Sequence, residues 1–282
     1  MAEPIRWLQR ARPLLGTVVS IRVPDADGAE AAIVAAFAEI ARLQDELSAH
    51  AADSALAHLN AHAHLRAQPL HGALGRVLRA SLALARASDG QFDPSVGGRL
   101  VAKGMRPRPA GIRADPRASW RDIRVHAGCV QFQRPLWLDF GGIAKGYAVD
   151  RALRVLRMRG VRIACISAGG DLRLAGTREV LSVRDPRDPG RSWPVAQLAD
   201  AAAATSAGSF SRRARDGELF DPRSGRVLGR HCSATVIARR AIWADALTKV
   251  VLAAPRGSVP LLRRLGAEAL LLDGRGGRHY LS

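Results

Sequence analysis

The sequence predicts an α+β fold with mainly antiparallel sheets packed against helices. Segments with helical spacing gather in the first third of the chain, whereas short strand-like segments dominate from Asp122 onward. Strands and helices also fail to alternate regularly, as they would in a doubly wound parallel sheet. With 282 residues, 48% of them hydrophobic, the chain can bury a full core, and we expect one domain over residues 1–282.

The first third of the chain predicts one strand and three helices. Apolar and polar residues alternate from Val19 to Val23, which is typical of a half-buried strand. Apolar residues then recur at helical spacing, and the predicted helices cover about 33–47, 53–60 and 74–88. The stretch from Gly97 to Asp115 is rich in Gly, Pro and Arg and predicts a long exposed connection.

From Asp122 onward the predicted strands are short. They cover Ile123–His126, Val130–Gln133, Leu136–Asp139, Val161–Ser167, Leu172–Ala175, Val180–Arg184, Ala202–Ser206, Glu218–Phe220 and Ala234–Ala238. Helices are predicted over Ala144–Arg159, which Gly160 closes, and over Trp243–Leu252 and Val259–Leu265. A hairpin of Ala269–Leu272 with His279–Leu281 ends the predicted order.

The composition carries an unusual charge. Lys and Arg number 43 against 25 Asp and Glu, so the formal net charge is +18, which ordinarily points to a polyanionic partner. The lysines are Lys103, Lys145 and Lys249, and the arginines are scattered from Arg6 to Arg278. A nucleic-acid footprint clusters on one face or stripe, so we expect no nucleic-acid partner. Nucleic-acid binding stays an alternative that rests on charge alone.

Targeting signals and disulfides are not expected. The three cysteines form no paired motif, which predicts reduced, buried thiols. The apolar run after Arg12 is short and interrupted, unlike a secretory signal, and no stretch approaches the roughly 18 apolar residues of a membrane span. We therefore expect a cytoplasmic protein.

The segment from Leu138 to Asp150 is the most informative one. A strand end, a glycine turn and a helix start follow one another, so backbone N–H groups can approach an anion closely. Lys145 lies in the first helical turn, where the helix dipole disfavours a cation. A bound phosphate would explain this lysine. An ordinary turn with an exposed lysine is the alternative.

Two further segments carry polar groups in unexpected places. Asp245 falls inside an apolar helical run, and a buried carboxylate there must be paired or must coordinate a cation. Thr248 follows one helical turn later, and the two oxygens could form a hard-cation site. An unremarkable Asp near a helix start is the alternative. Asp93 precedes a proline and by itself indicates only a loop.

Together these segments resemble the FAD:protein FMN transferase family, also known as ApbE. The resemblance covers most of the chain and keeps the family's order of motifs. Its motifs are Leu15-Gly16-Thr17, Ser48 to Asn60, Phe92-Asp93-Pro94-Ser95-Val96-Gly97, Leu138 to Asp150, Ser167-Ala168-Gly169-Gly170-Asp171, Asp221-Pro222-Arg223-Ser224-Gly225 and Ala244-Asp245-Ala246-Leu247. One such match is weak, but this many in order is strong.

The resemblance implies a T-fold-like architecture of two interleaved subdomains with FAD bound between them. It implies transfer of FMN from FAD to a threonine hydroxyl of a target protein, with release of AMP and dependence on Mg²⁺. By the same resemblance FAD would contact Leu15, Gln91, Phe92, Asp93, Asp139 and Lys145. Asp245, Thr248 and a backbone oxygen near Gly142 would hold Mg²⁺.

Two departures from the family pattern fall on the chemistry. Glu218 stands where the family has a histidine, and a glutamate with a reference pKa of about 4.3 needs a raised pKa to act as a base near neutrality. Lys249 stands where the family has a second hydroxyl residue, and an ammonium cannot ligate a metal. Mg²⁺ is then bound weakly or is replaced by the lysine charge. A catalytically impaired FAD-binding paralogue is the alternative function.

Overall fold

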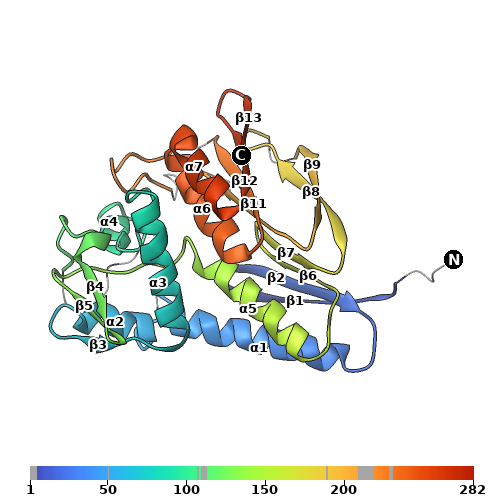
Figure 1. Cartoon of the computed structure of the whole chain (residues 1–282), viewed down its shortest axis with the longest axis horizontal. Helices are drawn as coiled ribbons and strands as arrows, with labels where there is room; N and C mark the ends of the chain where they lie inside the picture. Colours follow the sequence, from blue (N-terminus) through green and yellow to red (C-terminus); the bar gives the residue numbers. More distant parts are fainter. Residues whose placement is uncertain are drawn as a thin grey trace. The chain divides into compact units, whose positions relative to one another are not determined.

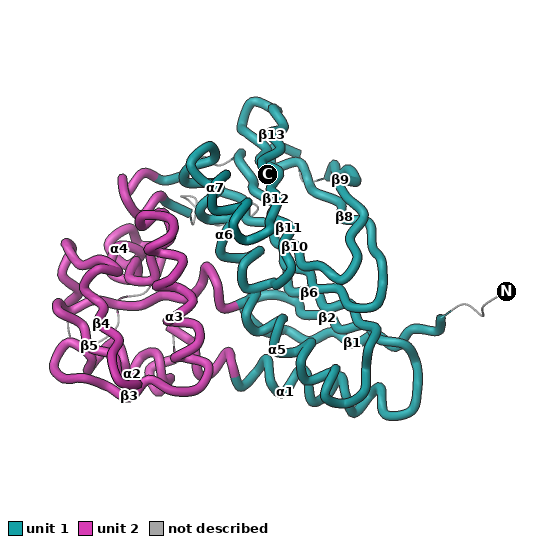
Figure 2. The backbone as a smooth tube through the Cα atoms, viewed as in Figure 1, with its two compact units in different colours: residues 1–42, 145–220, 227–282 teal, residues 43–144, 221–226 magenta. Residues whose placement is uncertain are grey.

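The chain forms two compact units whose segments interleave along the sequence (Figure 2). The structure, a computed structural model, describes residues 5–49, 51–106, 108, 113–188, 190–208, 219–228 and 231–282. Unit 1 comprises residues 1–42, 145–220 and 227–282, and unit 2 comprises residues 43–144 and 221–226. The predicted α+β class with two interleaved subdomains is confirmed.

Unit 1 contains an eight-stranded sheet in which every neighbouring pair is antiparallel (Figure 1). In spatial order its strands are β1 (Trp7–Leu14), β2 (Thr17–Pro24), β6 (Ala164–Ala168), β7 (Asp171–Ala175), β10 (Ala202–Ala207), β11 (Ser233–Ala238), β12 (Glu268–Leu272) and β13 (Arg278–Leu281). Strands β8 (Arg178–Arg184) and β9 (Ser192–Ala199) form a separate two-stranded ribbon.

Helix α6 (Ala241–Ala253) packs on strands β10 and β11. Its residues are buried nearly all round, as expected of a helix with apolar side chains on every face. Helix α7 (Pro255–Leu265) follows it, begins with proline in its first turn and ends at Gly266 in the left-handed conformation. The alternation in β2 buries Val19, Ile21 and Val23 completely, so one face of this strand belongs to the core of unit 1.

Helix α5 (Ala144–Met158) fixes the start of α6 through two contacts. At Gly146 an added Cβ would lie 2.1 Å from the carbonyl oxygen of Ala241, so only glycine permits this approach. One turn later, Asp150 accepts hydrogen bonds from Ala241 N at 3.0 Å and Ile242 N at 3.2 Å. The α6 N-cap residue, Arg240, makes no side-chain cap of its own. Asp150, which belongs to α5, therefore caps the start of α6.

Unit 2 combines short helices with a small antiparallel sheet. Its elements are α2 (Ala55–His62), α3 (Gly72–Ala87), α4 (Gly97–Ala102), a 3₁₀ turn (Trp120–Asp122) and the strand order β3 (Gln68–Pro69), β5 (Cys129–Phe132), β4 (Ile123–His126). Helix α1 (Ala29–Leu47) contributes its last residues to this unit. None of the helices in the described ranges is long and apolar enough to cross a bilayer.

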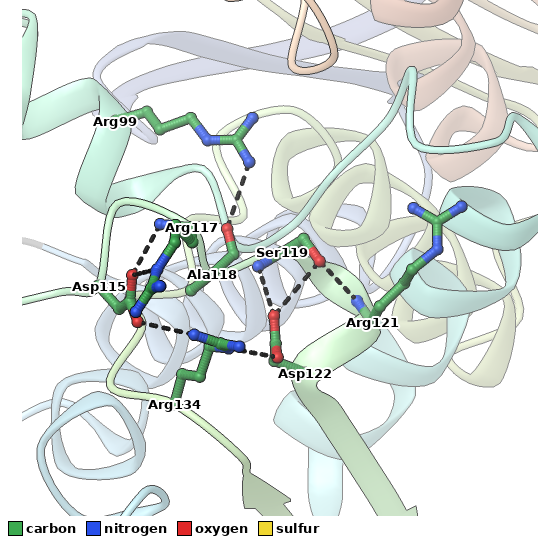
Figure 3. Close-up of polar contacts among 8 residues, drawn as sticks. All are labelled: Arg99, Asp115, Arg117, Ala118, Ser119, Arg121, Asp122 and Arg134. Atoms are coloured by element: carbon green, nitrogen blue, oxygen red, sulfur yellow. Dashed lines mark hydrogen bonds and ion pairs between the residues drawn. The ribbon is translucent and has the colours of Figure 1, made fainter.

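The connection that precedes β4 is held by arginines (Figure 3). Arg134 bridges Asp115 and Asp122, at 3.1 Å to each. Ser119 and Asp122 cap the 3₁₀ turn reciprocally, and Arg99 donates to the carbonyl oxygen of Ala118 at 3.2 Å. This connection is therefore ordered by named polar contacts within unit 2.

Two sequence predictions in unit 2 were wrong. Residues Leu136–Asp139 form only an isolated parallel bridge between Trp137 and Val96, because the Asn60 side chain takes the place of a neighbouring strand. It accepts from Leu138 N at 2.8 Å and donates to Leu138 O at 3.1 Å. The predicted exposed connection from Gly97 begins instead with α4, which buries Leu100.

Other elements differ in extent from the prediction. Strands β1, β3 and β9 were missed, and α7 begins at Pro255 rather than Val259. Of the predicted strand Glu218–Phe220, the described part contributes one antiparallel bridge from Phe220 to Val227. The three cysteines are free thiols but half-buried rather than buried.

Candidate active site

Lys145 is held at the start of α5 by a buried carboxylate. Its Nζ lies 3.0 Å from Oδ1 of Asp171, whose side chain is 1% exposed. Asp171 opens β7 directly after the Gly169-Gly170 turn. An added Cβ at position 170 would lie 2.6 Å from the carbonyl oxygen of Thr205, so this turn needs glycine there. The lysine thus has a local counter-charge, while 30% of its side chain stays exposed.

Asp245 has partners on both carboxylate oxygens. Its side chain is completely buried in α6, and Oδ2 accepts a hydrogen bond from Gly146 N at 3.0 Å. Oδ1 is ion-paired with the ammonium of Lys249, one helical turn later. The same ammonium donates to the backbone carbonyl oxygen of Asp245 at 3.0 Å. Two of the three N–H bonds of Lys249 are thereby directed at one residue.

Asp171, Asp245, Lys145 and Lys249 form what we call the four-charge cluster. Burial raises the pKa of Asp171 from its ordinary 3.8 to about 7, and the Asp245 carboxylate adds to the rise against the opposing lysines. Burial also disfavours ionised Asp245, but the ammonium groups of Lys249 and Lys145 outweigh it and keep the pKa of Asp245 below its ordinary value. Burial opposes the charge of Lys145 as well, and the two aspartates nevertheless raise its pKa. Near neutral pH the cluster therefore keeps Lys145 and Asp245 charged.

Thr248 turns its hydroxyl back onto its own helix. Oγ1 donates to the carbonyl oxygen of Asp245 at 2.7 Å. Ser206 Oγ, near the end of β10, lies 2.8 Å from Thr248 Oγ1, and because that hydroxyl already donates to Asp245, Ser206 acts as the donor in this second contact. The hydroxyl of Thr248 is thus used twice within the protein.

These contacts test whether Mg²⁺ fits at Asp245. Mg²⁺ requires an octahedron of oxygen ligands and usually retains several waters. Here one carboxylate oxygen faces an ammonium, the other faces a backbone N–H, and the Thr248 hydroxyl is already engaged. An ion at this point would have to displace the Lys249 ammonium or lie beside its like charge. The described donor set does not fit Mg²⁺ while Lys249 is in place.

A second polar group lies in unit 2, where two predicted segments meet. Asp139 N donates to the carbonyl oxygen of Pro94 at 2.9 Å, which joins the two segments. Asp139 Oδ1 accepts from Gly141 N at 2.7 Å and Oδ2 pairs with Arg106 at 3.1 Å. Asp93 Oδ1 accepts from the backbone and hydroxyl of Ser95, and burial raises the pKa of Asp93. Both carboxylates are thus fixed in tight turns.

An open pocket of about 360 Å³ lies beside Asp93 in unit 2. Its wall carries the Trp120 ring, with the Arg121 guanidinium 4.5 Å from the ring centroid. Asp89 pairs with Arg121 at 3.0 Å and with Arg223 at 3.3 Å. Aromatic and cationic groups together suit a planar or anionic ligand group.

Leu15 has an unusual backbone conformation for its residue type. Leu15 and Gly16 form the two-residue turn between β1 and β2, with φ of 56° and 71°. Such hairpin turns favour Asn or Gly at their first position, because a branched side chain is strained at positive φ. Strain of this kind often marks a functional position.

Comparison with known proteins decides the family. A model described as the ApbE family matches residues 15–271, which is most of the chain. The chain belongs to the ApbE family. The matched range includes every predicted site residue from Leu15 to Thr248.

Similar proteins agree with this membership. A Treponema pallidum protein named FAD:protein FMN transferase is 29% identical, over 95% of this chain and 85% of its own. The flavin transferase ApbE of Vibrio cholerae superposes with a TM-score of 0.84 at 21% identity, covering 99% of this chain and 98% of its own. The ApbE protein of Thermotoga maritima gives 0.82 at 24% identity, covering 98% and 97%. The two superpositions establish the ApbE fold.

The predicted ApbE site residues divide between the two units. Leu15, Lys145, Asp245 and Thr248 lie in unit 1, whereas Gln91, Phe92, Asp93, Asp139 and Gly142 lie in unit 2. Glu218 lies outside the described residues. Sequence reasoning missed the roles of Asp171, Ser206 and Arg106 as partners. The Gly-Gly turn pointed toward Asp171, but nothing distinguished Arg106 among so many arginines.

Proposed function

We propose that this protein transfers FMN from FAD to a threonine or serine hydroxyl of a target protein and releases AMP. The carrying observation is the ApbE family match over residues 15–271, supported by relatives that are named for this activity. The target protein and a cytoplasmic site of action belong to the proposal and come from the sequence.

The proposal assigns the FAD contacts residue by residue. Lys145 suits the pyrophosphate because its ammonium is kept charged and its side chain is partly exposed. Asp93 and Asp139 are assigned to the rest of FAD because each is fixed in a tight turn and the Pro94–Asp139 hydrogen bond holds the two turns together. The proposed FAD contacts are Leu15, Gln91, Phe92, Asp93, Asp139 and Lys145.

The reaction then follows from the chemistry of a pyrophosphate. The target hydroxyl oxygen attacks the phosphorus on the riboflavin side and forms a new P–O bond. The bond from that phosphorus to the bridging oxygen breaks, and the bridging oxygen leaves with AMP. The hydroxyl proton passes to a base, which we assign to Glu218 from the sequence alone. Lys145 offsets the negative charge that develops on the phosphates.

In the family pattern Asp245, Thr248 and a Gly142 backbone oxygen would hold Mg²⁺, which would supply charge neutralisation to the pyrophosphate. The contacts of Asp245 and Thr248 do not fit that ion while Lys249 is in place. The Lys249 ammonium supplies charge at the same carboxylate. No step of the proposed reaction depends on the metal.

The test uses purified protein, FAD and a threonine-bearing acceptor protein of a family transferase. We expect covalent FMN on the acceptor by mass spectrometry, with one AMP released per FMN transferred. Lys145→Met should weaken FAD affinity by about tenfold or more, because a charge-assisted contact is lost. Lys103→Met, at an exposed lysine of unit 2, is the matched control and should leave the affinity unchanged.

Two results would count against the proposal in different ways. Absence of any FAD binding by fluorescence titration would exclude a flavin function. FAD binding without AMP release or covalent FMN would favour the impaired paralogue, for which the Glu218 and Lys249 departures argue.

A further inference from the structure

We infer that the Lys249 ammonium is the permanent cation of this site, so that the protein holds the FAD pyrophosphate with two lysines and without a divalent metal. The inference takes its ligand from the proposed function. Its cation comes from the contacts of the four-charge cluster alone.

Asp245 is paired with a cation of its own helix. A completely buried carboxylate needs a compensating cation, since an unpaired buried charge is strongly unfavourable. Lys249 provides it from the next turn of the same helix, with an ion pair to Oδ1 and a hydrogen bond to the backbone oxygen. The i,i+4 spacing makes this contact part of α6 itself.

The charges of the four-charge cluster balance one another when Asp171 is ionised. Asp171 and Asp245 contribute two carboxylates, and Lys145 and Lys249 contribute two ammonium groups. When Asp171 is ionised, the set without Lys249 would have one excess carboxylate, which a bound cation would balance. With Lys249 the chain's own residues supply that balance, and an added divalent ion would bring excess positive charge whether Asp171 is ionised or protonated.

Both lysine side chains of the four-charge cluster are partly exposed. The Lys249 side chain keeps 18% exposure and the Lys145 side chain 30%, although their counter-ions are buried. Each ammonium group is paired with a carboxylate but has three N–H bonds, and we assign those not used within the protein to the phosphate oxygens. A pyrophosphate carries negative charge on both phosphates, which matches two cations of this kind. A chelator cannot remove a cation that is covalently part of the helix.

The decisive experiment measures Mg²⁺ in the absence of FAD. Wild-type protein should show no saturable Mg²⁺ binding by calorimetry and the same Tm in MgCl₂ and in EDTA. Lys249→Thr restores a hydroxyl oxygen and removes the ammonium, so its Tm should fall in EDTA and recover in MgCl₂. Lys249→Met is the matched control: it loses the same charge, offers no oxygen ligand, and should not recover.

The FAD arm uses fluorescence titration of the same proteins. Wild-type affinity should differ by less than about twofold between EDTA and MgCl₂, whereas Lys249→Thr should bind about tenfold more weakly in EDTA alone. Saturable Mg²⁺ binding by wild type, or loss of wild-type FAD affinity in EDTA, would overturn the inference. So would equal recovery of both variants.

The outcomes stay separable from the proposed function. If wild type binds no FAD under either condition, the proposed function fails and the calorimetry still decides the cation. If Lys249→Thr does not fold, the wild-type arms decide alone.

Discussion

Asp171 combines deep burial with a carboxylate oxygen, Oδ2, that has no hydrogen-bond partner among the described residues. Its other oxygen pairs with Lys145, and its pKa rises to about 7 because burial and the Asp245 charge disfavour ionisation. A carboxyl group that gains its proton near neutrality costs less to bury than one that stays ionised. Burying the ionised Asp171 carboxylate lowers the stability of the fold, and a pKa of about 7 means that its charge changes near neutral pH.

We expect the pH dependence of stability to report this carboxyl group. In the unfolded chain Asp171 titrates near its ordinary 3.8, and in the folded chain near 7. Between these values the folded state binds more protons, so the free energy of unfolding should fall as pH rises from about 4 to about 7. Asp171→Asn should flatten that fall, which urea unfolding at a series of pH values measures. An unchanged slope in the variant would assign the effect elsewhere.

At the scale of elements, the site depends on the close approach between the beginnings of α5 and α6. Gly146 brings its backbone N–H to Asp245, and Asp150 caps α6 from the same helix. The position of Asp245, and therefore of its cation, is set by helix packing rather than by a loop. Side chains on packed helices are positioned more precisely than side chains on loops.

Gly146→Ala should disturb both the packing and the site. The new methyl would meet the Ala241 carbonyl and the Asp245 Cβ, so we expect a loss of about 1–3 kcal/mol or more in the free energy of unfolding. Gly28→Ala is the comparison: it carries a positive φ but has open space, so it costs only about 1 kcal/mol of backbone strain. Thermal and urea unfolding check this, and equal losses in the two variants would argue against steric crowding at position 146.

Periodic elements could be predicted from the sequence, and long-range partners could not. Local spacing of apolar residues predicts the helices at 33–47 and 74–88 and the strand at 19–23, and the structure contains all three. The Leu136–Asp139 strand failed because Asn60, far away in sequence, satisfies the Leu138 backbone. At the site, Asp245 was recognised as a buried carboxylate that needs a partner. The ion pair between Lys145 and Asp171 depends on where the β6–β7 turn lies in the fold, and residue spacing does not predict that position.

At the scale of the whole molecule, arginines are scattered along the sequence, and many of them pair with nearby carboxylates. Several carboxylates each pair with two arginines, such as Asp89 with Arg121 and Arg223, and Asp150 with Arg173 and Arg240. Such pairs occur in both units. In these pairs the arginine charge lies beside local acidic residues.

We expect retention on duplex DNA to depend only weakly on salt. A true footprint of about six to ten phosphate contacts gives a slope of about −5 to −9 in log affinity against log salt. Scattered arginines should give a shallower slope, measured by fluorescence anisotropy over a salt series. An acidic polypeptide of matched charge should behave like DNA. A steep slope seen for DNA alone would revive the nucleic-acid alternative.

The interleaved order of the two units has a consequence for synthesis on the ribosome. The β1–β2 hairpin emerges first, but its sheet neighbour β6 follows only after residues 43–144 of unit 2 have been made. Until then β2 presents an open edge on which another nascent chain could pair. Arg10, Arg12 and Pro13 in β1, with Arg22 and Pro24 in β2, are residues that discourage such pairing. The arginines of this hairpin are therefore expected to limit pairing with other chains until β6 has been synthesised.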